Sequence, residues 1–208
     1  MTADSSPWDK DYTTRGRIWG GSPHVLPELP PGSYVLEMGS GSGKTLGALV
    51  TRSYEVVAID FSRKAAEMSH RTIRRYESGD AVGADARHLP FPAGIFNCVI
   101  AFHVIGHMQK EDRMTIALES ARILRRGGRL LFRGFSADDL RAGSGSIVEE
   151  GTRRRSAGMI IHYFNEEEVL SLFRAFITDT IQTHRWMMRV RRKDFARAEI
   201  VAVFTKPD

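Results

Sequence analysis

The chain has 208 residues, of which 42% are hydrophobic and 26% charged. This composition is typical of one globular domain with a sizeable core, and it argues against global disorder. The net charge of +5 is uneven, because residues 120–208 carry 17 Lys and Arg against 11 Asp and Glu, whereas residues 1–119 are nearly balanced. The basic C-terminal half predicts either a soluble basic face or an anionic partner.

Cellular setting follows from cysteine usage and from the absence of long apolar segments. Cys98 is the only cysteine, so an intramolecular disulfide is excluded and a reducing, cytoplasmic setting is expected. Residues 1–17 have no apolar segment, and no run approaches the ~20 apolar residues of a membrane helix. We therefore expect neither a secretory signal nor a membrane partner.

The first half of the chain alternates short apolar runs with helical patterns. After a polar, turn-rich stretch of about 30 residues, strands are predicted at 33–38, 54–60 and 96–104, with a weaker one at 81–85. Helices are predicted over 45–51 and 63–76, and Ser62 can cap the second. This alternation is typical of an α/β fold with a mainly parallel sheet.

The second half begins with a helix predicted over 110–125, in which Met114, Leu118, Ala121 and Leu124 share one face. Gly127 and Gly128 end it, and a strand follows at 129–135. Residues 136–164 are predicted to be irregular. Asn165 and Glu168 are a capping pair for a helix over 166–176. Strands at 179–190 and 196–204 flank a turn and predict an antiparallel hairpin.

Residues 35–45, VLEMGSGSGKT, contain a glycine-rich loop directly after the first strand. The nucleotide-hydrolase pattern G-x-x-x-x-G-K-[ST] would need a glycine where Met38 stands. The dinucleotide pattern G-x-G-x-x-G, counted from Gly39, would need a glycine where Lys44 stands. The spacing that fits is E/D-x-G-x-G-x-G, running from Glu37 to Gly43.

With this spacing the sequence resembles the class I S-adenosylmethionine (SAM)-dependent methyltransferases, in particular the small single-domain type similar to ubiquinone/menaquinone-biosynthesis methyltransferases. Further matches are VVAIDFS, GADARHLPF, FNCVIAFHVIGHM and ILRRGGRLLF, in that order. The resemblance covers residues 33–135 well. It implies a Rossmann-like, seven-stranded, mainly parallel sheet with the last strand antiparallel and helices on both faces. It also implies one domain over 1–208, with a lid-like segment at 1–32 and an insertion at 136–165.

The resemblance also implies a set of SAM-binding residues. Asp60 would accept hydrogen bonds from the ribose hydroxyl groups, and Asp85 from the exocyclic amine of adenine. Glu37 would anchor the loop or face the ammonium group. The complete implied set is Glu37, Gly39, Ser40, Gly41, Asp60, Phe61, Asp85, Ala86, Phe102, His103, Tyr12 and Trp19. The N-terminal aromatics could lie near the sulfonium, or could pin a surface helix to the core.

His103 and His107 are the candidate catalytic residues, since an imidazole at the end of the fourth strand could take a proton from the acceptor. Each could instead be a structural histidine, and His162 with Tyr163 could reach the cleft or serve packing. Transfer from SAM needs mainly positioning, so no catalytic triad is expected. No Cys/His cluster has zinc spacing, so no metal is predicted.

The methyl acceptor is not identified by any motif. Residues 136–164 are expected to form part of its site, with Arg153–Arg155 receiving an anionic group. A second hypothesis replaces the small acceptor by RNA or a translation component, which suits the basic C-terminal half. A third is a SAM-binding protein without turnover that acts through a protein partner.

Overall fold

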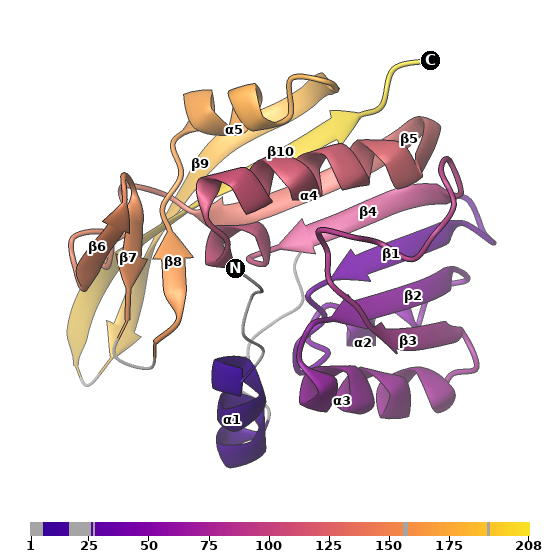
Figure 1. Cartoon of the computed structure of the whole chain (residues 1–208), viewed down its shortest axis with the longest axis horizontal. Helices are drawn as coiled ribbons and strands as arrows, with labels where there is room; N and C mark the ends of the chain where they lie inside the picture. The colour runs from indigo at the N-terminus through magenta and orange to yellow at the C-terminus, as the bar shows by residue number, and fades with distance from the viewer. Residues whose placement is uncertain (1–5, 17–25, 27, 156–157, 191) are drawn as a thin grey trace.

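The computed structural model describes residues 6–16, 26, 28–155, 158–190 and 192–208. Its main feature is a seven-stranded sheet of order β3-β2-β1-β4-β5-β10-β9 (Figure 1). All neighbouring strands pair in parallel except β10, which is antiparallel to β5 and to β9. The strands are β1 (Tyr34–Met38), β2 (Glu55–Asp60), β3 (Gly79–Gly83), β4 (Phe96–Phe102), β5 (Leu124–Phe135), β9 (Ile177–Val190) and β10 (Lys193–Thr205). The predicted fold class is confirmed.

Both faces of the central strands are buried, which explains why these strands read as unbroken apolar runs. Alternate residues of one strand belong to different cores: Cys98 and Ile100 pack with α2 (Leu46–Leu49) and α3 (Arg63–Arg74). Val99 of the same strand packs with α4 (Lys110–Ile123) and α5 (Glu166–Leu172). Figure 1 shows α4 and α5 over one face and α2 and α3 over the other.

The predicted apolar face of α4 is wrong in part, because Ala121 and Leu124 pack against the core but Met114 and Leu118 do not. Met114 and Leu118 are 51% and 68% exposed, and the buried residues of this helix are Arg113, Ile116, Ala117, Ser120 and Ile123. The buried face includes an arginine and a serine whose polar atoms are hydrogen-bonded inside the protein, to Met108 O and Ile116 O among others. Counting apolar residues therefore selects a neighbouring face of the helix.

The helix caps are as predicted, although the helices are shorter. Ser62 Oγ accepts a hydrogen bond from the backbone N–H of Ala65 at the start of α3 (3.1 Å), and Asn165 Oδ1 accepts one from Glu168 at the start of α5 (2.7 Å). The helix expected over 45–51 is the four-residue α2, and the helix α4 ends at Ile123, directly before β5.

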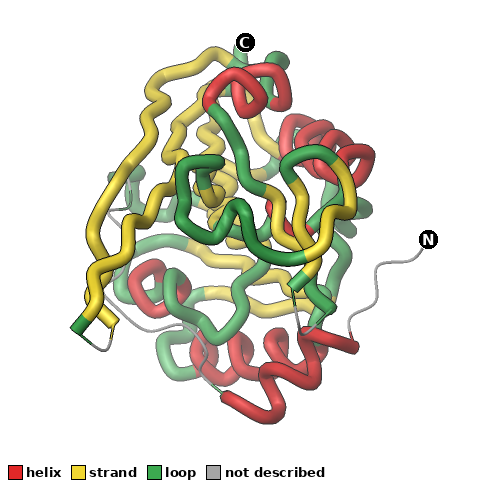
Figure 2. The backbone as a smooth tube through the Cα atoms, turned by 90° about the vertical axis from the view of Figure 1, so that its left-hand side faces the viewer, coloured by secondary structure: helices red, strands yellow, loops and turns green. Residues whose placement is uncertain are grey.

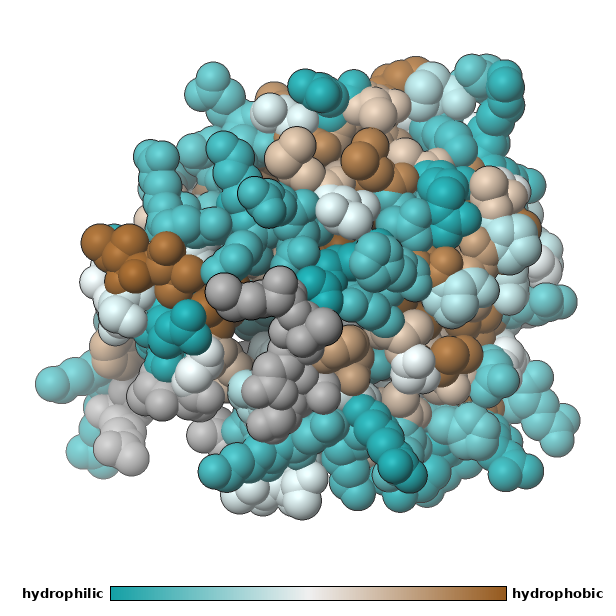
Figure 3. Space-filling view, in the orientation of Figure 1, coloured by the Kyte–Doolittle hydropathy of each residue, from teal (hydrophilic) through white to brown (hydrophobic). Residues whose placement is uncertain are grey.

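Residues 136–164 were expected to be irregular, and this expectation is wrong in part. They contain a three-stranded antiparallel sheet of β6 (Ser146–Glu149), β7 (Thr152–Arg154) and β8 (Ile160–His162), which faces the viewer in Figure 2. Buried polar contacts fix this sheet to the helices, because Arg113 binds Glu149 (2.6 Å) and His162 lies 2.8 Å from the Glu168 carboxylate. Figure 3 shows apolar surface over this region, where Ile147 is 72% exposed.

The predicted antiparallel hairpin is confirmed as β9 and β10. Glu199–Thr205 pair with β5, whereas residues 193–198 have β9 as their only paired strand in the described structure and form a two-stranded ribbon. Ser136 and Leu140, after β5, donate backbone hydrogen bonds to Ala198 and Ala196 of this ribbon. At the other end of the chain, α1 (Ser6–Arg15) lies against α3: Asp9 Oδ1 accepts from Ser62 Oγ (2.5 Å) and from the Lys64 N–H (3.2 Å). Of the described helices, none combines the length and apolarity that crossing a membrane requires.

Candidate functional site

The glycine loop after β1 has a backbone conformation that strongly favours glycine. Gly39, Gly41 and Gly43 have φ of +67°, +54° and +79°, in the left-handed region. A Cβ on Gly39 would lie 2.7 Å from Val104 Cγ2, and a Cβ on Gly41 would lie 2.6 Å from Tyr12 Oη. The loop therefore forms a close-fitting surface between β1, the end of β4 and α1.

Asp60, at the end of β2, holds this loop in place. Its Oδ2 accepts from the Gly41 N–H and its Oδ1 from the Ser62 N–H, both at 2.8 Å. Burial raises the pKa of Asp60 to about 6, although these two backbone hydrogen bonds oppose the increase. A carboxylate has about four acceptor positions, so the two backbone bonds leave capacity for the ribose hydroxyl groups.

Glu37, on β1, is a buried carboxyl group beside the loop. It is 4% exposed, and its Oε2 has no hydrogen-bond partner among the described residues. Burial and the nearby charge of Asp60 raise the pKa of Glu37 to about 8, against opposing hydrogen bonds from Leu46 N–H and Thr45. A cationic ammonium group would satisfy such an oxygen, so the residues present fit the amino-acid part of SAM.

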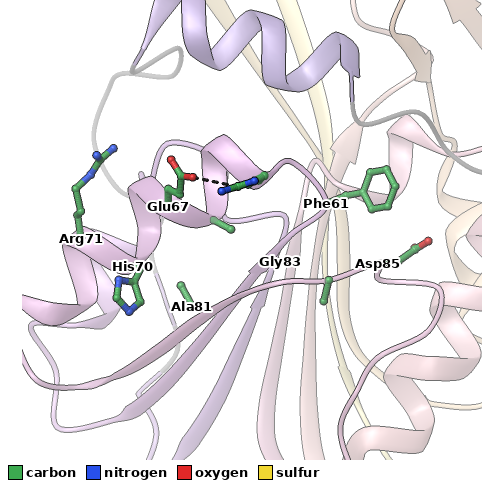
Figure 4. A pocket seen from close by; sticks show the side chains of 10 residues that line it. Phe61, Glu67, His70, Arg71, Ala81, Gly83 and Asp85 are labelled. Carbon is green, nitrogen blue, oxygen red and sulfur yellow. Dashed lines mark hydrogen bonds and ion pairs between the residues drawn. The ribbon is translucent and has the colours of Figure 1, made fainter.

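A pocket of about 690 Å³ lies between α3 and β3, and Phe61 and Asp85 line the end of it that is drawn at the right in Figure 4. Asp85 is already paired, because Arg87 Nη2 lies 2.6 Å from its Oδ2. Burial raises the pKa of Asp85, but the hydrogen bonds and charge of Arg87 outweigh burial and hold that pKa below its usual range. Ala86 is 6% exposed. The adenine-binding role of Asp85 stays a prediction, and it would have to compete with Arg87.

The N-terminal helix α1 supplies aromatic side chains to the same region. Tyr12 is 5% exposed, and burial together with Asp60 raises the pKa of its hydroxyl group. Trp8 meets His107 edge-on, with ring centroids 4.7 Å apart, a contact that sequence reasoning missed. Ser40 is joined to α3 through a 2.7 Å hydrogen bond to Ser69. Trp19 lies outside the described residues.

His103 directly follows β4 with φ of +58°, an uncommon conformation for a residue with a Cβ. Its Nε2 lies 3.1 Å from Glu199 Oε2, on β10, so the carboxylate orients the imidazole. Phe102 precedes it, under the guanidinium of Arg133 (5.1 Å). Sequence reasoning missed Glu199, although an acidic residue within the apolar run AEIVAVF is a recognisable signal.

His107 is in a different environment from His103. Its Nδ1 lies 2.8 Å from the Ile160 carbonyl oxygen on β8. Burial lowers the pKa of His107 to about 4, and the nearby His103 and Arg141 contribute to the decrease. The ring is therefore neutral at ordinary pH and joins the small sheet to the end of β4, which favours the structural alternative for His107.

A cluster of charged side chains lies beyond the carboxyl ends of β4 and β5, and we call it the acceptor-side cluster. Its members are Arg133, Asp139, Arg141, Arg197 and Glu199. Asp139 is bound by Arg141 Nε (2.9 Å) and Arg197 Nε (2.7 Å), and Glu199 by Arg133 Nη1 (2.8 Å). These residues come from three separate segments and meet around Phe135, since Arg141 and Arg197 stack over its ring.

The anion-binding role expected of Arg153, Arg154 and Arg155 stays a prediction. Their side chains bind three different carbonyl oxygens, those of Ala142, Gly158 and Ser144 respectively. Successive residues of a strand point to opposite faces, so a run of three arginines divides between the two faces of the small sheet. No three His, Cys, Asp or Glu side chains of the described residues are grouped as metal ligands would be.

Comparison with known proteins agrees with this geometry. Residues 36–132 match the family model described as a methyltransferase domain. The chain is 36% identical over 120 residues to a tRNA (carboxymethyluridine(34)-5-O)-methyltransferase of Xenopus tropicalis, covering 57% of this chain and 18% of that protein. It is 35% identical over 127 residues to a ubiquinone/menaquinone biosynthesis C-methyltransferase of Pseudomonas fluorescens, covering 58% and 48%. The chain thus spans less than half the length of either relative.

Among solved structures, a SAM-dependent methyltransferase from Methanosarcina mazei superposes with a TM-score of 0.73. The two chains are 21% identical, and the match covers 86% of this chain and 94% of that one. The fold, the matched domain and the fit of Glu37 and Asp60 to the family's cofactor lead to one conclusion. Residues 36–132 are a methyltransferase domain, and the chain has the fold of a class I SAM-dependent methyltransferase.

Proposed function

We propose that this chain transfers the methyl group of SAM to an acceptor bound beside His103. SAM supplies an activated methyl group on a sulfonium, so transfer is an in-line displacement that needs mainly alignment and exclusion of water. The observation that carries the proposal is the buried Oε2 of Glu37, which has no hydrogen-bond partner in the described part of the chain and lies next to a glycine loop held by Asp60. Residues 1–32 would act as the lid of a single domain, since α1 already lies against this loop.

His103 is proposed as the proton acceptor when the methyl acceptor is a hydroxyl, an amine or an acidic carbon. Glu199 supports this role because a carboxylate 3.1 Å from Nε2 fixes the orientation of the ring. The uncommon φ of His103 is consistent with a residue whose position is imposed by the site. His107, neutral and bound to Ile160, would serve to position the small sheet.

The cofactor assignment is tested by calorimetry with SAM, S-adenosylhomocysteine, ATP and NAD. SAM and S-adenosylhomocysteine should bind, and ATP and NAD should bind far more weakly. Replacing Asp60 by alanine removes the ribose acceptor and the clamp on Gly41, so SAM affinity should fall about tenfold or more. Asp80→Ala, at an exposed acid on β3, is the matched control and should leave the dissociation constant unchanged. Tight Mg·ATP binding without SAM binding would end this proposal.

RNA is the second candidate acceptor. It is supported by the relative that methylates tRNA and by the exposed cations of the β9–β10 hairpin, which include Arg185, Arg189, Arg192 and Lys193. RNA bound by such side chains should dissociate steeply as salt increases. A fluorescence-anisotropy titration with tRNA measures this binding. If tRNA does not bind, or if its binding is independent of salt, the RNA hypothesis is contradicted and the small-acceptor hypothesis is retained.

A protein that binds SAM without turnover would produce no S-adenosylhomocysteine with any acceptor, which separates the third hypothesis from the other two.

We propose a cytoplasmic location, supported by the single cysteine, Cys98, which is a buried thiol in β4.

A further inference from the structure

Two buried polar groups beside Phe135 have no hydrogen-bond partner in the part of the chain that the structure describes. They are the hydroxyl group of Tyr163 and the Nη2 of Arg141. Tyr163 is only 3% exposed, so its hydroxyl group has little access to solvent. Buried donors are nearly always hydrogen-bonded in native proteins, so two such groups at one place are suited to bind a polar group from outside the chain.

The two groups come from different segments and meet at one ring. Arg141, in the turn after β5, places its guanidinium carbon 4.1 Å from the centroid of Phe135. The ring of Tyr163, which follows β8, lies 6.4 Å from the same centroid. The ring centroid of His103 lies 4.5 Å from that of Phe135. Arg141, Tyr163 and His103 therefore all surround Phe135, on the side of the molecule where the proposed proton acceptor lies.

The charge balance of the acceptor-side cluster indicates the charge of the molecule that would bind there. The cluster has three guanidinium groups, those of Arg133, Arg141 and Arg197, against two carboxylates, those of Asp139 and Glu199. Burial raises the pKa of Tyr163, but Arg141 and then Arg155 act in the opposite direction, which places positive charge near the phenol. An anion would balance the excess positive charge.

We propose that Arg141 and Tyr163 bind an anionic oxygen group, a carboxylate or a phosphate, of the methyl acceptor. This rests on the proposed function and adds the class of acceptor to it. Arg141 Nη2 and Tyr163 Oη both donate, and the guanidinium supplies the charge that makes such hydrogen bonds strong. Asp139 holds Arg141 by its Nε, which keeps the guanidinium in place over Phe135. The anion is thus proposed to bind at Arg141 and Tyr163, whereas the sequence predicted that Arg153–Arg155 would receive it.

The test uses the full chain saturated with S-adenosylhomocysteine and titrates it calorimetrically with three probes. Benzoate carries a carboxylate, inorganic phosphate carries a phosphate, and benzamide is the neutral analogue of benzoate. At least one of the two anions should bind, and benzamide should bind about tenfold more weakly than benzoate or not at all. Binding of benzoate alone assigns a carboxylate acceptor, and binding of phosphate alone assigns a phosphorylated one.

Three variants connect this binding to the named groups. Tyr163→Phe should weaken anion binding about tenfold, and Arg141→Met by at least as much. Arg154→Met is the control, because Arg154 is an exposed arginine of the same small sheet, and it should change nothing. In the absence of anions, Tyr163→Phe should have a melting temperature equal to or above that of the wild type, because it removes an unpaired buried hydroxyl group. A hydroxyl group with a structural role would lower it.

Several results would overturn the inference: no anion binding, benzamide binding as tightly as benzoate, or unchanged anion affinity in Tyr163→Phe. If Arg141→Met fails to fold, Tyr163→Phe alone decides. Binding of S-adenosylhomocysteine is measured first in each variant and should remain at the wild-type value. Failure of the wild type to bind S-adenosylhomocysteine would contradict the proposed function, whereas normal binding of it without anion recognition would contradict only this inference.

Discussion

The donor side and the acceptor side of this site are built by different means. On the donor side, the alternating glycines Gly39, Gly41 and Gly43 give the backbone its conformation. A single side chain, Asp60, accepts hydrogen bonds from the backbone N–H groups of this region. On the acceptor side, long side chains from β5, β10 and the segment after β5 bind one another. Backbone conformation leaves a local sequence pattern, whereas the sequence does not show which distant side chains will contact one another.

The two sides should therefore be sensitive to different kinds of substitution. The donor side should be sensitive to any added atom, because its limits are steric. The acceptor side should be sensitive to loss of charge balance, because its guanidinium groups depend on buried carboxylates. Three predictions separate these sensitivities, from the largest expected effect to the smallest.

Asp139→Asn should damage the acceptor side most. The Asp139 side chain has no exposed surface and binds both Arg141 and Arg197, so neutralising it leaves two buried cations with a weaker partner. Removing one partner of a buried ion pair costs about 3–5 kcal/mol. Chemical denaturation measures the loss, and the SAM affinity of the folded protein should not change.

The neighbouring residue provides the control for this experiment. Asp138 is 55% exposed and pairs with Arg185, which is 62% exposed, so Asp138→Asn should cost less than about 1 kcal/mol. Equal losses for the two variants would show that burial of Asp139 does not decide the strength of its contacts.

Gly39→Ala should damage the donor side instead. The left-handed conformation costs about 1–2 kcal/mol for alanine, and the contact at 2.7 Å with Val104 adds an overpacking cost of about 1–3 kcal/mol. Stability and SAM affinity should both fall, because the loop must move. Gly47→Ala in α2 is the control: its Cβ meets nothing within 4 Å and should stabilise the helix by about 0.5–1 kcal/mol. A tolerated Gly39→Ala would refute the steric account of the loop.

The pH dependence of Glu37 gives the smallest effect. Its pKa in the folded chain is about 8, above the ordinary 4.5, so the folded state retains a proton that the unfolded state loses. The stability that this provides is therefore lost as pH rises towards 8, by up to about 1.4 kcal/mol between pH 6.5 and 7.5. Asp60 contributes little in that window because its pKa is about 6.

Thermal denaturation across this window should show the decrease in the wild type and not in Glu37→Gln. SAM affinity should change in the opposite direction, increasing with pH, because an ammonium group beside Glu37 favours the carboxylate form. An affinity that is independent of pH from 6.5 to 7.5 would mean that Glu37 anchors the loop and does not face the ligand.

Much of the fold could be predicted because its signals are local. Buried parallel strands are short apolar runs, and Ser62 and Asn165 cap helices through bonds to residues three positions along the chain. The apolar face of α4 could not be found in the same way, since it depends on which side chains have partners elsewhere. Arg113 is buried because Glu149, in the small sheet, lies 2.6 Å away. The small sheet itself was missed, because polar residues such as Thr152 and His162 face its interior and bind each other.

The sequence by itself determined the class of this protein, the loop from Glu37 to Gly43 and the acid at the end of β2. Each of these depends on residue type and spacing within a few positions, which is also what fixes backbone conformation. Only the tertiary structure decided which charges meet: Glu199 with His103, and Asp139 with Arg141 and Arg197. These partners are up to 96 positions apart and are joined by sheet pairing. The acceptor side therefore became visible only when the antiparallel β10 was placed beside β5.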